Sequence, residues 1–209
     1  MRKSFVSLFT LAALTAAFCT SVTAHAHEKG KAHDAAKVGA PAPAFTLKDQ
    51  TGKDVSLSDY AGKIVVLEWF NEGCPFVVKH YKQGHMNTLA AKYAEKGVVW
   101  LAINSTKSAT VESNSKITGE WKINHPILDD AAGTIGKAYA AKTTPHMYVI
   151  DAKGVLAYAG AIDSKSSTDS DDIAGSTNYV GKAVDELLAG SNVTESQTKP
   201  YGCSVKYAK

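Results

Sequence analysis

The sequence predicts an α/β fold with a central mixed β-sheet flanked by helices. Two nearly continuous apolar runs, residues 64–70 and 98–104, have the composition of buried strands, and a helical segment separates them. A strand, a helix and a second strand in this order form a βαβ unit, so these two strands pair in parallel. Later, a strand ending at Asp151 turns at Lys153-Gly154 into residues 155–162, which predicts an antiparallel hairpin. Parallel and antiparallel pairs together predict a mixed sheet.

The first 26 residues have the pattern of a signal peptide. Arg2 and Lys3 form a basic start, the apolar run that follows is short for a membrane span, and Ala24-His25-Ala26 offers a cleavage site. We therefore expect an exported protein, periplasmic or secreted, with no membrane span after cleavage. Cleavage removes two positive charges and no acids, so the formal net charge falls from +3 to +1. Such a balance argues against a nucleic-acid partner.

The rest of the chain divides into a lead-in, one domain and a tail. Residues 27–37 are polar and predict a flexible lead-in; their two histidines could form only a weak metal site, and a solvated segment is the simpler interpretation. Residues 38–190 predict one domain. It starts with an N-terminal hairpin, in which residues 45–47 and 55–57 flank a turn. Residues 191–209 predict an irregular tail that carries Cys203. No metal-ligand spacing and no cofactor motif occurs, and the sequence leaves the oligomeric state open.

Helical patterns fill the intervals between the strands. The helix that starts at Cys74 is expected to reach about Glu95 with an interruption at Gly84, and further helices are expected over residues 111–122, 131–141 and 179–188. Residues 164–176 form a polar loop rich in Ser and Asp. A loop of that length is either a functional cover or mobile.

The first strand delivers Cys74 to the start of a helix. Pro75 suits the first helical position, which needs no amide donor. A thiol at this place faces unpaired backbone amides and the positive end of the helix dipole, both of which favour the thiolate. The alternative interpretation is a cysteine that serves as a small core residue. His80, six residues further on, points about 240° round the helix, away from the sulfur.

Glu68 is an acidic residue within a strand otherwise made of apolar side chains. In a dry core its charged form is disfavoured, so its pKa should rise and it could exchange protons near neutrality. The alternative is a residue at a sheet edge, paired with a lysine such as Lys63. The sequence leaves both possibilities open.

The segments Leu67–Pro75, Thr144-Pro145 and Val149–Gly154 resemble the thioredoxin fold. More narrowly, the chain resembles the redoxin branch, the peroxiredoxin-like alkyl hydroperoxide reductase and thiol-specific antioxidant (AhpC/TSA) family, over roughly residues 38–188. This resemblance implies a thioredoxin-like fold with a central mixed β-sheet and a thiol-dependent oxidoreductase or peroxidase-like antioxidant activity.

The resemblance also implies roles for particular residues. Cys74 matches the attacking cysteine of a Cys-x-x-Cys motif, and Val77 stands where the second cysteine would be. Pro145 matches the cis-proline beside the attacking sulfur, so Thr144, Pro145 and Pro75 are expected to line the substrate groove. A trans proline in an ordinary turn is the alternative. Glu68 resembles the buried aspartate that moves protons in thioredoxins.

The chain departs from the peroxiredoxin pattern in two respects, the motif before the cysteine and the activating arginine. That family places a proline seven residues and a threonine or serine three residues before its reactive cysteine, where this chain has Leu67 and Asn71. Its peroxide-activating arginine falls about where Pro145 stands. Both departures count against an efficient peroxidase.

Cys203 is the candidate resolving residue. The fourteen residues after Ala189 can span up to about 45 Å, so the tail can reach Cys74. In one interpretation Cys74 attacks a disulfide of a partner protein or a hydroperoxide, and Cys203 resolves the product. In the other, the two cysteines form a permanent disulfide that pins the tail to a non-catalytic binding module. Such a bridge could stabilise the chain by about 4–5 kcal/mol.

Overall fold

The central strand of the sheet is β3 (Val65–Trp69), which is buried along its whole length. The computed structural model describes Met1 and residues 35–208. The remainder of the predicted signal peptide and most of the predicted lead-in, residues 27–37, therefore lie outside the described residues.

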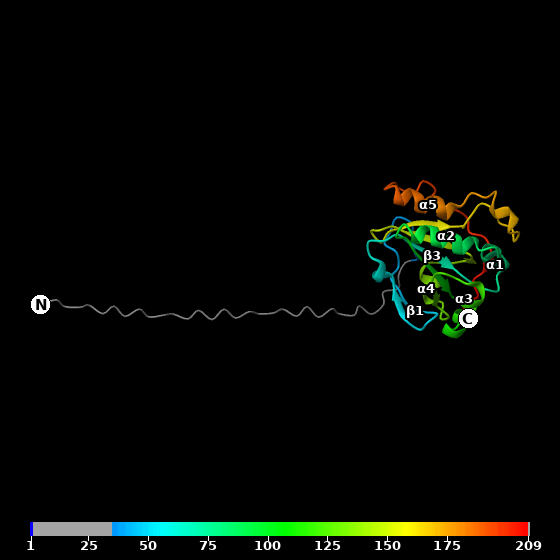
Figure 1. Ribbon diagram of the computed structural model, residues 1–209, viewed down its shortest axis with the longest axis horizontal. Helices are drawn as coiled ribbons and strands as arrows, with labels where there is room; N and C mark the ends of the chain where they lie inside the picture. Colours follow the sequence, from blue (N-terminus) through cyan, green and yellow to red (C-terminus); the bar gives the residue numbers. More distant parts are fainter. Residues whose placement is uncertain (2–34, 209) are drawn as a thin grey trace. The chain divides into compact units, whose positions relative to one another are not determined.

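In the described part of the chain, seven strands form the main sheet in the order β2-β1-β5-β4-β3-β7-β8; β1 and β3 are labelled in Figure 1. Their bounds are β1 Thr46–Asp49, β2 Asp54–Ser56, β4 Val99–Asn104, β5 Ile127–Asp129, β7 Met147–Ile150 and β8 Leu156–Gly160. Strands β3, β4 and β5 pair in parallel, whereas β7 pairs antiparallel with both β3 and β8. The predicted mixed sheet is confirmed, and so is the N-terminal hairpin, formed by β1 and β2.

Five helices accompany this sheet in the described part of the chain: α1 Pro75–Lys82, α2 His85–Ala94, α3 Val111–Trp121, α4 Thr134–Ala138 and α5 Tyr179–Leu188. Short 3-10 turns occupy Leu57–Tyr60 and Asp171–Ile173. The expected interruption at Gly84, whose φ is 74°, separates α1 from α2 completely. The helix expected over 131–141 is only α4, because the backbone has a positive φ at both Gly133 and Ala140.

Side chains of β3 alternate between two apolar cores, one on each face of the sheet. Val66 and Phe70 belong to the core that includes buried residues of α1, α2 and α5. Leu67 and Trp69 belong to the second core, which contains Phe45 and other residues of the N-terminal hairpin. Figure 1 shows α2 and α5 near each other on one side of the sheet. Because β3 is covered on both faces, it offers a rigid base for the residues that follow its carboxyl end.

The tail is more ordered than the sequence predicts. Cys203–Ser204 forms strand β9, which pairs antiparallel with β6 (Thr143–Thr144) in a small separate sheet. Upstream, Gln197 forms a bridge with Ala159 at the edge of β8. The expectation of an irregular tail is therefore wrong for these residues. Two-residue strands and isolated bridges carry no periodic apolar pattern, so the sequence offers no signal for them.

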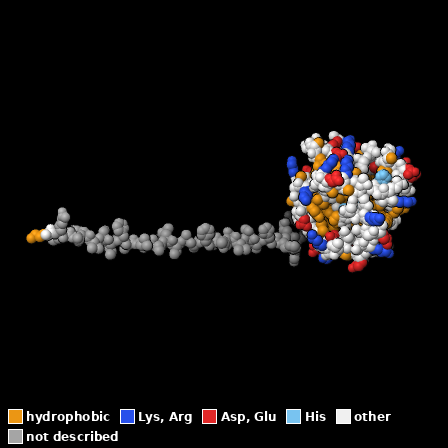
Figure 2. All heavy atoms as spheres, viewed as in Figure 1, with side chains coloured by type: hydrophobic (Ala, Val, Ile, Leu, Met, Phe, Trp, Pro, Cys, Tyr) orange, Lys and Arg blue, Asp and Glu red, His pale blue; other side chains and the backbone are white. Residues whose placement is uncertain are grey.

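The surface of the folded part is mixed in charge. On the face drawn in Figure 2, basic and acidic side chains alternate over the surface with apolar patches between them. Among the residues that the structure describes, no helix combines the length and the apolar character required to cross a bilayer.

Candidate functional site

The turn between β3 and α1 presents Cys74. Asn71 shapes this turn: its side-chain oxygen accepts a hydrogen bond from the Gly73 amide at 2.7 Å, and its carbonyl accepts one from the Cys74 amide at 3.1 Å. Cys74 is the N-cap residue of α1 with an extended backbone, and Pro75 occupies the first helical position as predicted. The sulfur therefore lies at the amino end of a helix that continues from the central strand.

Thr144, the residue before Pro145, lies directly against this sulfur. The Thr144–Pro145 peptide bond is cis, which confirms the prediction for Pro145. The Cys74 thiol donates a hydrogen bond to the Thr144 carbonyl at 2.9 Å. Three parts of the chain that the sequence singled out, residues 74–75, residues 144–145 and the end of β3, thus meet at one place.

Cys203 reaches the same place from the tail. Strand β9 pairs with β6 in a register that sets Cys203 opposite Thr144, the residue whose carbonyl contacts Cys74. Cys203 packs against the core cluster that contains Cys74, and its thiol and backbone amide lie close enough to lower the pKa of Cys74. Both cysteines are free thiols in this structure. Two sulfurs so placed can exchange between a dithiol and a disulfide.

The two thiols differ in acidity. Burial raises the pKa of Cys74, but hydrogen bonds from the side chains of Cys203 and Thr144 and from the backbone amides of Cys203 and Val77 outweigh burial, so the net shift is downward. For Cys203, burial and the neighbouring Cys74 raise the pKa to about 11. The thiolate therefore forms first on Cys74.

Access to Cys74 is restricted. Its side chain is only 1% exposed, and Cys203 is half-buried above it. An open cleft of about 440 Å³ adjoins the site, lined by Gly73, Pro75, Val78, Lys79, Lys82 and residues 168–170. Pro75 lines this cleft, whereas Thr144 and Pro145 are not among its lining residues and lie beside Gly202 of the tail. Residues 168–170 of loop 164–176 supply one wall of the cleft.

Glu68 lies within the central strand and not at a sheet edge. Its side chain is fully buried, and one carboxyl oxygen accepts hydrogen bonds from the Tyr81 hydroxyl at 3.0 Å and the Trp100 indole at 3.2 Å. Burial raises its pKa to about 7, although both hydrogen bonds act in the opposite direction. The predicted rise is confirmed, and the alternative of an edge residue paired with Lys63 is wrong because β3 has neighbours on both sides.

The hydrogen bonds of Glu68 join it to Tyr81 and Trp100 and not to Cys74. Tyr81 also contacts the His125 ring at 3.0 Å, and the His125 nitrogen lies 4.0 Å from the Glu68 carboxyl. Burial lowers the pKa of His125 to about 4, so the ring is neutral at pH 7. The sequence did not indicate Tyr81, Trp100 or His125 as site residues. Tyr81 had one available signal, because it follows Cys74 by seven residues and so lies on the same face of α1.

Neither His80 on α1 nor His146, the residue after Pro145, forms a hydrogen bond with the Cys74 sulfur. His80 is buried and contacts the Tyr201 hydroxyl at 3.3 Å, while His146 contacts Tyr148. Burial lowers the pKa of each histidine to about 4. Within residues 35–208 the structure brings together no group of three His, Cys, Asp or Glu side chains suited to a metal ion.

Comparisons with known proteins agree with this geometry. The chain is 30% identical over 118 residues to the thiol-disulfide oxidoreductase ResA of Bacillus thuringiensis, a match that covers 56% of this chain and 66% of that relative, slightly less than two thirds of its length. It is 31% identical over 138 residues to a Synechocystis protein named as a candidate peroxiredoxin, covering 59% of this chain and 68% of that protein.

Solved structures extend the likeness over more of the chain. A hypothetical protein from Sinorhizobium meliloti matches with a TM-score of 0.70 and 26% identity, covering 84% of this chain and 97% of that one. An uncharacterised conserved protein from Geobacillus kaustophilus matches with a TM-score of 0.69 and 30% identity, covering 82% and 93%. The fold and site define a thioredoxin-like protein. Residues 38–159 match the AhpC/TSA family, and the chain belongs to that family.

Proposed function

We propose that this chain is an exported thiol-disulfide oxidoreductase in which Cys74 attacks and Cys203 resolves. The observation that carries the proposal is the pairing of β9 with β6, which brings the tail cysteine to the sulfur at the start of α1. Family membership and relatives named as oxidoreductases support the same class. The partners are proteins with a reactive disulfide or dithiol.

The reaction consists of two exchanges. The Cys74 thiolate attacks one sulfur of a partner disulfide, so a mixed disulfide forms and the other partner sulfur leaves as a thiolate. The Cys203 thiolate then attacks the Cys74 sulfur and releases the second partner thiol. The partner gains two electrons and the chain is left with a Cys74–Cys203 disulfide, which an external dithiol reduces by the reverse exchange.

The acidity of the two thiols fits this order. Cys74 is the more acidic and attacks first. The raised pKa of Cys203 comes partly from its contact with Cys74. That contribution disappears when Cys74 is bonded to a partner sulfur and carries no charge. Cys203 then becomes easier to deprotonate at the step in which it must act.

Supporting residues surround the pair. The Thr144 carbonyl contacts Cys74, Pro145 follows Thr144 through a cis peptide bond, and Pro75 borders the cleft. We therefore assign these three residues to substrate binding. Glu68, with a pKa of about 7, can take up or release a proton at neutral pH. We assign it to proton balance in the core behind the site, since it makes no hydrogen bond with either thiol.

Hydroperoxide is the second candidate substrate, favoured by the likeness to a protein named as a candidate peroxiredoxin. In that reaction the Cys74 thiolate attacks one peroxide oxygen, the O–O bond breaks, and the other oxygen leaves as an alkoxide or hydroxide that takes up a proton from water. The resulting Cys74 sulfenic acid condenses with the Cys203 thiol to give a disulfide and water. The position of Asn71 weakens this candidate, because its side chain is engaged with the Gly73 amide in shaping the turn.

One experiment separates these reactions. The purified protein, Cys74→Ser and Cys203→Ser are each assayed for reduction of a protein disulfide with a dithiol donor and for consumption of hydrogen peroxide. We expect disulfide reduction to exceed peroxide consumption, to vanish in Cys74→Ser, and to stop at a trapped mixed disulfide in Cys203→Ser. Peroxide turnover that depends on Cys74 without disulfide reduction would favour the peroxidase, and activity that survives Cys74→Ser would refute both.

Export is a separate part of the proposal. It is supported by the amino-terminal pattern of residues 1–26 and by the use of cysteines as a redox pair, which suits an oxidising compartment. Fractionation of cells that express the full chain, with mass spectrometry of the mature amino terminus, tests it. We expect a periplasmic or secreted product that begins after residue 24 or 26, and an uncleaved intracellular chain would contradict export.

A further inference from the structure

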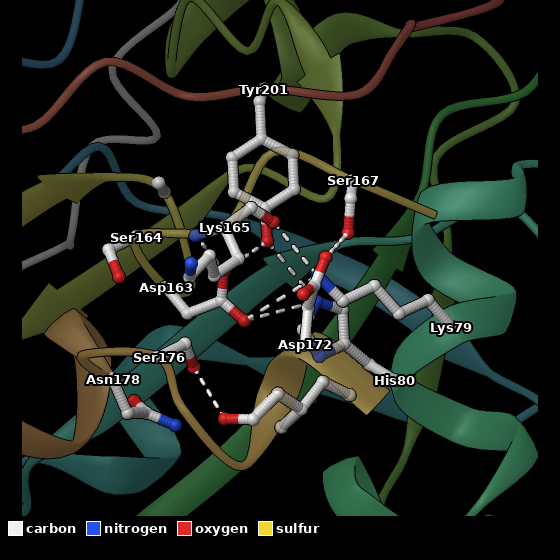
Figure 3. A network of polar contacts seen from close by, with 12 residues as sticks. Lys79, His80, Asp163, Ser164, Lys165, Ser167, Asp172, Ser176, Asn178 and Tyr201 are labelled. Atoms are coloured by element: carbon white, nitrogen blue, oxygen red, sulfur yellow. Dashed lines mark hydrogen bonds and ion pairs between the residues drawn. The ribbon is translucent and has the colours of Figure 1, made fainter. Parts of the chain in front are cut away.

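The segment around Tyr201 carries a polar cluster that the exchange reaction does not use. Tyr201 lies two residues before Cys203, and its hydroxyl donates a hydrogen bond to Asp163 at 2.6 Å. Figure 3 shows the ring entering from the tail, with Lys79 and His80 approaching from α1. The cluster therefore joins the tail, the active-site helix and the segment that follows β8.

Asp163 is the centre of this cluster. Asp163 is only 2% exposed. The carboxyl oxygen that accepts the hydrogen bond from Tyr201 also accepts one from the Lys165 amide at 2.9 Å. The other oxygen has no hydrogen-bond partner among the described residues and lies 3.9 Å from both the Lys79 nitrogen and a His80 nitrogen. A buried carboxylate beside a buried ammonium group is a strong acceptor for a phenol hydroxyl.

The ring of Tyr201 is fixed as well as its hydroxyl. It packs against Phe76 with 5.8 Å between ring centroids, and Phe76 belongs to the first turn of α1, two residues after Cys74. The His80 ring contacts the same hydroxyl. The side chain that precedes Cys203 by two residues is thus anchored on the helix that presents Cys74.

We propose that Tyr201 is a positioning residue whose bond to Asp163 holds Cys203 beside Cys74. The inference rests on the proposed function, because it gives the tail its purpose in that reaction. Release of the Tyr201 hydroxyl lets the tail leave β6, which uncovers Cys74 for a partner protein. Return of the hydroxyl to Asp163 restores the high local concentration of Cys203 that resolves the mixed disulfide.

The first test measures the equilibrium between the Cys74–Cys203 disulfide and glutathione, read by mass spectrometry of the two cysteine peptides. Tyr201→Phe keeps the ring on Phe76 and removes only the hydroxyl. Loss of a hydrogen bond to a charged group corresponds to roughly a tenfold change in an equilibrium constant, so we expect the effective concentration of Cys203 to fall by about that factor.

Tyr207→Phe is the matched control on the same tail. Its hydroxyl donates to the Ala141 carbonyl at 2.8 Å, away from Asp163 and α1, and it follows Cys203 by four residues. We expect Tyr207→Phe to lower the effective concentration of Cys203 less than Tyr201→Phe does. Equal effects of the two substitutions, or none from Tyr201→Phe, would overturn the positioning role.

A second measurement does not depend on disulfide formation. In the Cys203→Ser background, the rate of alkylation of Cys74 reports how often the tail leaves its place. We expect Tyr201→Phe to raise this rate several-fold at unchanged resistance to urea, and an unchanged rate would overturn the proposal. If wild-type Cys74 and Cys203 never form a disulfide but Tyr201→Phe still uncovers Cys74, the oxidoreductase mechanism fails while the anchoring of the tail by Tyr201 stands.

Discussion

At the scale of single residues, the site depends on donors aimed at one buried sulfur. Cys74 is almost inaccessible, and burial alone would keep it protonated. The hydrogen bonds from Cys203 and Val77 reverse that tendency. The acidity of Cys74 is therefore a property of the helix start together with the docked tail, so a change at Cys203 should alter it.

Cys203→Ala should raise the pKa of Cys74 above its wild-type value, because the substitution removes the side-chain donor of the tail. Cys203→Ser should raise it less, since a serine hydroxyl still donates. The midpoint of the pH dependence of Cys74 alkylation, read on the Cys74 peptide, measures both. A midpoint in Cys203→Ala equal to that of the wild type would show that the tail thiol does not stabilise the thiolate.

Glu68→Gln should remove a pH dependence of stability. The pKa of Glu68 rises from 4.5 in the unfolded chain to about 7 in the folded one, so its contribution is fully present below pH 4.5 and is lost as pH rises through about 7. The difference of about 2.5 pH units corresponds to roughly 3 kcal/mol. Urea unfolding should show that the free energy of unfolding of the wild type falls by this amount, relative to that of Glu68→Gln, between about pH 4 and about pH 8. Parallel curves would mean that Glu68 ionises normally in the fold.

The pKa shifts and contacts of single residues were only partly predictable from the sequence. A lone acid within an apolar strand was sufficient to indicate the raised pKa of Glu68, because strand burial follows from composition. The partners of Glu68 were not predictable, since Trp100 and His125 come from other strands and loops that only the folded chain brings together. The burial of Lys79 had no signal either, as a lysine on a helix is usually solvated.

At the scale of elements, the short pair β6 and β9 determines whether the second thiol reaches the first. Gly202 makes this pairing possible. Its φ is 128°, which disfavours other residues, and a Cβ at this position would overlap the Thr144 carbonyl oxygen. That carbonyl also contacts the Cys74 thiol. The glycine before Cys203 is thus required for the close approach of the tail.

Gly202→Ala should separate β9 from β6 and move Cys203 away from Cys74. We expect the first exchange with a partner disulfide to persist while resolution slows at least tenfold, so that the mixed disulfide accumulates. Non-reducing electrophoresis of the reaction with a partner disulfide measures this. Gly190→Ala is the control, because that glycine also has a positive φ but no atom within 4 Å of its added Cβ and lies far from Cys203 in sequence. Equal accumulation in the two variants would contradict the role of Gly202.

The sequence predicted some helices and strands better than others. The long apolar strands and α5 were predictable because burial imposes a clear period on their residues. The exact length of α4 depended on positive φ values at Gly133 and Ala140, and an alanine gives no warning of such a conformation. Strand β9 exists because of its partner strand, so local sequence could not show it.

At the scale of the whole molecule, the docked tail does not rely on a disulfide. The thiols are free, yet residues 197–207 bind β8, β6 and the neighbouring loops through backbone and side-chain hydrogen bonds. The tail therefore belongs to the reduced fold. This arrangement differs from a module whose tail is held only by a covalent bridge.

Cys203→Ser should accordingly fold and keep its tail in place. We expect its free energy of unfolding to lie within about 1 kcal/mol of that of the reduced wild-type protein. Amide hydrogen exchange should still protect the Val205 amide, which donates to the Lys142 carbonyl. Loss of that protection in reduced wild-type protein would show that the tail docks only when it is covalently bonded.

The most direct test of the account is the reduction potential of the Cys74–Cys203 pair, measured in dithiol buffers with mass spectrometry of both cysteine peptides. A working pair gives a disulfide with a potential above about −300 mV that a partner dithiol can reduce. A potential below that value would identify a permanent structural bridge, and no disulfide at any potential would show that Cys203 does not resolve Cys74.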